Sequence, residues 1–132
     1  MIIVLDASAG IEIALDREKA VILNSVLTNS SKVITSDLYK AETANVIWKY
    51  FKAKLISKEE AFRTLKYCDS LVDEYIDISE NSEEALVESM RINHSTYDLL
   101  YFTIARRRGA ILMSMDKKLN SLAFEKGIEI IK

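Results

Sequence analysis

Four acidic residues of this sequence could act together in one chemical site, although they lie far apart along the chain: Asp6, Glu42, Asp98 and Asp116. Asp6 directly follows the apolar run 2–5, and Asp116 stands three residues after the apolar run 110–113. Short apolar runs of this kind are typical of strands that are buried on both faces. Because ligands bind at the carboxyl ends of the strands in open α/β sheets, we expect both acids at that edge of one sheet.

The other two acids stand out because their neighbours are apolar. Glu42 falls within a predicted helical stripe, which consists of Leu38, Ala41, Asn45 and Trp48. Asp98 lies in the apolar segment 97–102, near the start of a helix that we expect to be central in the fold. A carboxylate in such surroundings is unfavourable unless it is paired or bound to a metal ion. Both acids are therefore expected to reach the same edge of the sheet.

Each acid also has an ordinary structural explanation. Asp6 and Asp116 are good helix N-cap residues, and Asp98 could complete a capping box that begins at Ser95. Glu42 could pair with a lysine. Grouped at one edge, however, these carboxylates repel one another unless protons or a cation neutralise them. Oxygen ligands without histidine or cysteine suit Mg²⁺ or Mn²⁺, and such a cluster commonly activates water for phosphodiester cleavage.

Composition narrows the class of protein. The chain has 132 residues, of which 49% are hydrophobic and 29% charged, so we expect a single folded domain over residues 1–132. With 18 basic and 20 acidic residues, it lacks a generally basic coat for nucleic acid. The single histidine and single cysteine exclude a two-histidine metal site, a cysteine zinc cage and an intramolecular disulfide. No apolar run is long enough to span a membrane, and we expect a cytoplasmic protein.

The spacing of apolar residues predicts the secondary structure. Strands are predicted at 2–5, 33–35, 75–78, 110–113 and 127–131. Helices are predicted at 8–15, 18–28, 36–54, 57–71, 82–90, 95–108 and 116–126. Ser57 and Glu60 form the pattern of a capping box, and Gly109 is a fitting helix end. Short strands separated by helices indicate an α/β fold with a mainly parallel sheet of four or five strands.

Four segments taken together resemble the PIN domain family, and specifically the VapC-type ribonuclease toxins of type II toxin–antitoxin pairs. These segments are 4–8, 40–46, 96–101 and 113–116, and the segment 105–112 also fits. They occur in the family's order and spacing, and the resemblance covers the whole chain. It implies a three-layer α/β/α sandwich and Mg²⁺- or Mn²⁺-dependent endoribonuclease activity. It also implies a homodimer and inhibition by a cognate antitoxin protein.

The resemblance assigns metal binding and catalysis to Asp6, Glu42, Asp98 and Asp116, with Ser8, Asn45 and Ser114 in support. Family members often carry another acid two residues after the last one, where this chain has Lys118. This departure keeps open an alternative, a PIN-like module that binds RNA or protein and is catalytically impaired. A third reading, a phosphate-accepting receiver domain, would require paired acids after the first strand, where Asp6 stands alone.

Basic residues beside the predicted site could contact RNA phosphates. Lys117 and Lys118 directly follow the last acid, and a second group consists of Arg106, Arg107 and Arg108. The arginines could instead complement the dipole at a helix C-terminus. We expect His94 to be a surface residue and Trp48 to lie in the core or at a dimer interface. Three further aromatic residues are expected in the core: Tyr97, Tyr101 and Phe102.

Overall fold

Four parallel strands form the centre of the computed structural model, which describes residues 1–131. Their spatial order is β3-β2-β1-β4, with the bounds β1 (Ile2–Leu5), β2 (Lys32–Ser36), β3 (Glu74–Ile76) and β4 (Ile111–Met113). In the register of the sheet, Val4 of β1 pairs with Ile34 of β2 on one side and with Leu112 of β4 on the other. The predicted parallel α/β sheet is confirmed.

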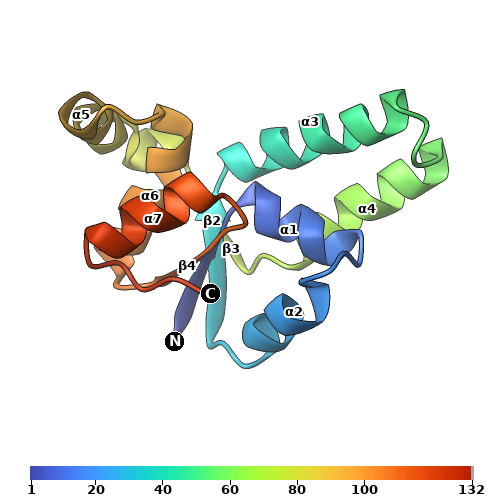
Figure 1. Cartoon of the computed structure of the whole chain (residues 1–132), viewed down its shortest axis with the longest axis horizontal. Coiled ribbons are helices and arrows are strands. Elements are labelled where there is room, and N and C mark those ends of the chain that lie inside the picture. The colour runs from blue at the N-terminus through green and yellow to red at the C-terminus, as the bar shows by residue number, and fades with distance from the viewer. Residues whose placement is uncertain (132) are drawn as a thin grey trace.

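Helices cover both faces of this sheet. They are α1 (Ala7–Ala14), α2 (Ala20–Thr28), α3 (Leu38–Lys52), α4 (Lys58–Ser70), α5 (Ser82–Ile92), α6 (Thr96–Arg108) and α7 (Lys117–Glu125). Figure 1 shows α5, α6 and α7 on one side of the strands and α1 to α4 on the other, which gives the three expected layers. None of the helices within residues 1–131 combines the length and the apolar character that a membrane span requires.

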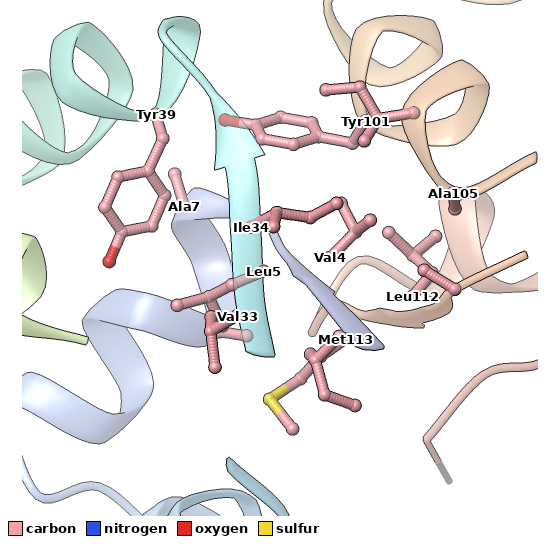
Figure 2. Packing of buried hydrophobic residues seen from close by; sticks show 14 of the residues in the cluster. Val4, Leu5, Ala7, Val33, Ile34, Tyr39, Tyr101, Ala105, Leu112 and Met113 are labelled. Atoms are coloured by element: carbon pink, nitrogen blue, oxygen red, sulfur yellow. The ribbon is translucent and has the colours of Figure 1, made fainter. Parts of the chain in front are cut away.

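Both faces of the strand β1 are shielded from solvent. Ile3, Val4 and Leu5 are all completely buried. Successive side chains of a strand point to opposite faces, and Figure 2 shows Val4 and Leu5 on opposite sides of the sheet. A central strand covered on both sides reads as an unbroken apolar run, which explains why this strand was predictable from its residues alone.

The helix ends follow the expected sequence signals. At the start of α4, the N–H of Glu60 donates to the Ser57 hydroxyl, and the Ser57 N–H donates to the Glu60 carboxylate, both at 3.1 Å. Gly109 ends α6 in the left-handed region, at a φ of +58°. Asp116 is the N-cap residue of α7. These predictions are confirmed.

The predicted fifth strand, 127–131, is wrong as an element. Within the described chain it is reduced to one parallel bridge between Ile130 and Leu112. The strand β4 has only three residues, so it offers little edge for another strand to extend. The third strand also ends earlier than predicted, at Ile76, because Asp77 caps a 3₁₀ turn by accepting a hydrogen bond from the N–H of Ser79 at 2.8 Å.

The buried face of α3 differs from the predicted stripe. Tyr39, Thr43 and Ile47 are buried, whereas Asn45 is exposed and Trp48 is 51% exposed. Thr43 can be buried because its hydroxyl donates to the carbonyl of Tyr39, at 2.7 Å, within the same helix. The predicted stripe therefore lies on the wrong face, and Trp48 is not in the core, which leaves a dimer interface as the part of its prediction that stays open.

Helix α6 is central, as predicted, but only in its middle. The run 99–105 is buried throughout, and Tyr101 and Phe102 lie in the core as expected. Tyr97 is 63% exposed, which contradicts its predicted place in the core. It belongs to the first turn of α6, which precedes the completely buried stretch and lies nearer to solvent.

Helices α1 and α3 approach each other closely at Gly10. A Cβ atom at this position would lie 2.9 Å from Cε2 and 3.0 Å from Cζ of Tyr39. Tyr39 cannot easily move, because it is buried and its hydroxyl donates to the carbonyl of Cys68 at 2.7 Å. Glycine is therefore required here for close packing.

We predict that overpacking in Gly10→Ala costs about 2–3 kcal/mol of unfolding free energy, because the added methyl group meets both the hydroxyl and the ring of Tyr39. This loss should outweigh the gain of about 1 kcal/mol that alanine brings to a helix interior. Chemical denaturation would measure it. The substitution Tyr39→Phe should lower the free energy of unfolding less in the Gly10→Ala variant than in the wild type. In the variant it also removes the hydroxyl that crowds the added methyl group. A variant Gly10→Ala as stable as the wild type would contradict this packing argument.

Candidate active site

The strand order of the sheet reverses beside β1. The chain adds β2 and β3 on one side of β1 and then places β4 on the other side. No crossover covers the carboxyl ends of β1 and β4 at such a reversal, and α/β proteins bind ligands there. Asp6 directly follows β1, and its N–H donates to the carbonyl of Met113, the last residue of β4, at 3.1 Å. The fold thus brings Asp6 and the segment 114–116 together at this edge.

Asp6 carries a buried carboxylate, with only 5% of the residue exposed. Its Oδ1 accepts hydrogen bonds from the Ala9 N–H at 3.0 Å and the Ser8 hydroxyl at 2.7 Å, and its Oδ2 accepts from the Ser114 hydroxyl. Burial nevertheless raises the pKa of Asp6 to about 6, and the negative charge of Glu42 adds to this effect. The protein therefore holds this negative charge in an unfavourable environment.

Two serines join the ends of β1 and β4. The hydroxyl oxygens of Ser8 and Ser114 lie 3.3 Å apart, and both contact Asp6. The N–H of Met115 donates to the Ser8 hydroxyl oxygen, and the N–H of Asp116 donates to that of Ser114, both at 2.9 Å. The serines therefore fix the Asp6 carboxylate and the backbone that carries Asp116.

Glu42 reaches the same region from α3. Its Oε1 accepts a hydrogen bond from the Tyr101 hydroxyl at 2.6 Å, so its partner is a tyrosine rather than a lysine. Figure 2 shows the side chain of Tyr101 extending from α6 past the end of β2 toward α3, the helix that carries Glu42. Partial burial raises the pKa of Glu42, and the negative charge of Asp98 raises it further, against the effect of Tyr101. Asn45, on the next turn of α3, is exposed.

Asp98 stands in the first turn of α6 and faces His94. The distance from His94 Nε2 to Asp98 Oδ2 is 2.8 Å. The capping box suggested for Ser95 is not formed, since Ser95 accepts only from the Tyr97 N–H, at 3.3 Å. The expectation that His94 is a surface residue holds only in part, because the residue lines a surface pocket but only 18% of its side chain is exposed. The four-residue spacing of His94 and Asp98 across a helix start is the signal that could have indicated this contact.

Asp116 is the N-cap residue of α7. Its Oδ1 accepts hydrogen bonds from the N–H groups of Lys118, at 2.9 Å, and Leu119, at 3.2 Å. Asp6 caps α1 in the same way, through the N–H of Ala9. The ordinary structural explanation therefore holds for both residues, and both lie at the ligand-binding edge of the sheet as well.

The donor set of this site suits a hard divalent cation, because it offers carboxylate and hydroxyl oxygens. The raised pKa values of Asp6 and Glu42 agree with such a site, since a cation would offset the charges that burial and mutual repulsion disfavour. Within residues 1–131, no three acidic, histidine or cysteine side chains lie close enough together to form a preformed metal site. Each acid instead contacts the protein partner described above.

The basic residues divide into two groups. Arg106 and Arg107 contact Glu84 at 3.5 Å and 3.0 Å, and Arg108 contacts Glu74 at 3.9 Å. These arginines lie at the far end of α6 from the acids, roughly 12 Å along its axis at 1.5 Å per residue. Lys117 and Lys118 are exposed at the start of α7 and line a surface pocket with His94. The lysines are therefore the basic group next to the candidate site.

Comparison with known proteins gives consistent results. The model of the PIN domain family matches residues 3–125. Ribonuclease VapC3 of Pyrobaculum aerophilum is 25% identical over 129 residues, which cover 90% of this chain and 92% of that protein. The crystal structure of PAE2754 from the same organism, also 25% identical, has a TM-score of 0.72 and covers 98% of this chain and 92% of its own.

Two more distant structures share the fold. VapC20 of Mycobacterium tuberculosis, described as a sarcin-ricin loop cleaving toxin, is 16% identical, with a TM-score of 0.69 and coverage of 91% and 94%. VapBC2 of Rickettsia felis, bound to a DNA fragment from its promoter, gives 18% identity, a TM-score of 0.68 and coverage of 99% and 98%. The family model spans the sheet and the edge that carries all four acids, and this chain belongs to the PIN domain family.

Proposed function

We propose that this protein is an Mg²⁺- or Mn²⁺-dependent endoribonuclease that acts as the toxin of a toxin–antitoxin pair. The observation that carries this proposal is the buried Asp6, whose pKa is raised to about 6 at the ligand-binding edge of a PIN fold. Ribonuclease VapC3, similar over nine-tenths of the chain, supports RNA as the substrate. VapBC2, a structure of the same fold, supports an antitoxin as the partner. We further propose that the protein acts as a homodimer in the cytoplasm.

In this proposal, Asp6, Glu42, Asp98 and Asp116 hold the cation. When bound there, a cation would supply positive charge for the activation of water and for offsetting the charge that develops on the phosphate. Ser8 and Ser114 keep the Asp6 carboxylate oriented through their hydroxyl groups. Glu42 orients the attacking water or accepts its proton, as a carboxylate beside the reacting phosphate can.

The surroundings of the site have supporting roles. Tyr101 donates to Glu42 and so restricts the rotation of that carboxylate. Lys117 and Lys118 are exposed beside Asp116, where they would contact RNA phosphates next to the scissile bond. Arg106, Arg107 and Arg108 have acidic partners on the protein, so we assign them a smaller role in RNA binding.

Asp98→Asn tests the assignment of the acids. We expect at least about a 100-fold loss of RNA cleavage, because a carboxylate that holds the cation contributes several kcal/mol to transition-state stabilisation. Purified protein, freed of any partner, is incubated with total cellular RNA in Mn²⁺, Mg²⁺ or EDTA. The control is Glu59→Gln, which removes a carboxylate from the exposed start of α4.

Fragments from the wild type and from Glu59→Gln, absent with EDTA and with Asp98→Asn, would support the proposal. Equal cleavage by Asp98→Asn would contradict it. Metal-independent binding of RNA by a wild type that cleaves nothing would favour the binding module instead.

Asp6 predicts a particular dependence of stability on pH. Its pKa rises from 3.8 to about 6 on folding, so the folded chain binds this proton more tightly than the unfolded chain. Stability of the metal-free protein should therefore fall as the pH rises from about 4 to about 6 because of this group. Asp6→Asn, which cannot ionise, should remove this contribution.

Relative to the wild type, Asp6→Asn should gain about 1–3 kcal/mol of unfolding free energy between pH 4 and pH 7, at 1.36 kcal/mol per pKa unit. Denaturant titrations without metal at both pH values would measure the gain. Adding Mn²⁺ at pH 7 should stabilise the wild type and not the variant, because a ligand of the folded state stabilises it. A difference between variant and wild type that stays constant with pH would contradict the burial argument.

A further inference from the structure

We propose that His94 is a positioning residue for the candidate metal centre, because it fixes the Asp98 carboxylate. This inference rests on the proposed function, which assigns Asp98 to the cation. The observation behind it is the 2.8 Å contact between His94 Nε2 and Asp98 Oδ2. Both side chains are largely shielded from solvent, with 18% and 25% of their surface exposed. A hydrogen bond in this setting is less weakened by competing water than one on the open surface.

The backbone holds His94 in place between α5 and α6. Asn93 ends α5 in the left-handed region, at a φ of +55°, and the His94 N–H donates to the carbonyl of Ser89 at 3.3 Å. The Ser89 hydroxyl also donates to the hydroxyl oxygen of Thr96, at 3.0 Å, and so ties the end of α5 to the start of α6. The residues on both sides of His94 are therefore fixed with respect to Asp98.

Deeper contacts keep these two helices together. The buried side chain of Asn81, at the start of α5, donates to the carbonyl of Leu100 at 3.0 Å and to the Thr103 hydroxyl at 2.7 Å. At the surface, Arg106 of α6 contacts Glu88 of α5 at 3.1 Å. His94 thus stands on a rigid support, which a residue that orients another side chain requires.

The pocket around His94 shows that its contact with Asp98 is selective. Glu125 lines the same pocket with Lys117, Lys118 and Ser121, but among the described residues the carboxylate within hydrogen-bond distance of His94 is that of Asp98. A histidine N–H on a metal-binding carboxylate restricts its orientation, and loss of such a contact typically lowers metal affinity 10- to 100-fold. We therefore assign His94 a role in cation affinity.

The test compares His94→Gln with His94→Leu. The side-chain amide of glutamine can place an N–H close to the position of Nε2, whereas leucine retains apolar bulk but cannot donate. Ser121→Ala is the matched control, because it changes the same pocket without touching Asp98. Binding of Mn²⁺ alone to the full chain is followed by electron paramagnetic resonance without RNA, and thermal melting without metal verifies that each variant folds.

We expect His94→Leu to weaken Mn²⁺ binding about 10- to 100-fold. His94→Gln and Ser121→Ala should stay within about threefold of the wild type, since they retain the donor to Asp98. If Asp98→Asn abolishes binding and His94→Leu does not weaken it, the inference is wrong while the proposed function stands. Equal losses in the glutamine and leucine variants would also overturn it, because they would indicate packing alone. If Asp98→Asn binds Mn²⁺ like the wild type, the metal-site assignment fails, and the role of His94 fails with it.

Discussion

The burial of one carboxylate, that of Asp6, is the constraint on which the site depends. A charged group in the interior is costly, and here three hydrogen-bond donors reduce the cost: the Ala9 N–H and the hydroxyl groups of Ser8 and Ser114. Two of these donors lie in the first turn of α1, and the third directly follows β4. The position of β4 beside β1 is therefore as important to Asp6 as it is to the sheet.

Each of the three neighbouring acids likewise has its own hydrogen-bond partner within the protein. Glu42 accepts from Tyr101, Asp98 contacts His94, and Asp116 accepts from the backbone of α7. These contacts do not remove the cost of the charges, since burial, with a smaller contribution from the neighbouring acids, keeps the pKa values of Asp6 and Glu42 raised. The folded chain therefore stores unfavourable electrostatic energy at one edge, and a cation would release it.

The sequence predicted those features that depend on local rules. We could predict that Asp6 follows a buried strand and that Ser57 begins a capping box. A continuous apolar run indicates a strand buried on both faces, and cap residues indicate where a helix begins. Predictions failed where packing between distant segments decides the outcome. Thr43 lies on the face of α3 that packs against the rest of the fold, where its hydroxyl bonds within the helix, and Tyr97 precedes the buried part of α6. The partial burial of His94 could not be predicted, because it depends on how α5 meets α6.

The hydrogen bonds of this edge join residues that are synthesised far apart in time. Ser114 contacts Asp6 across 108 positions, and Tyr101 contacts Glu42 across 59. A nascent chain that has not yet emerged from the ribosome beyond β4 lacks one of the donors to Asp6 and all of Asp116. It can form helices early, because their hydrogen bonds are local, but its acidic centre cannot assemble until the distant segments are present. Fragments that end before β4 therefore carry no assembled centre, and the chain has its complete set of acids only once Asp116 has been synthesised.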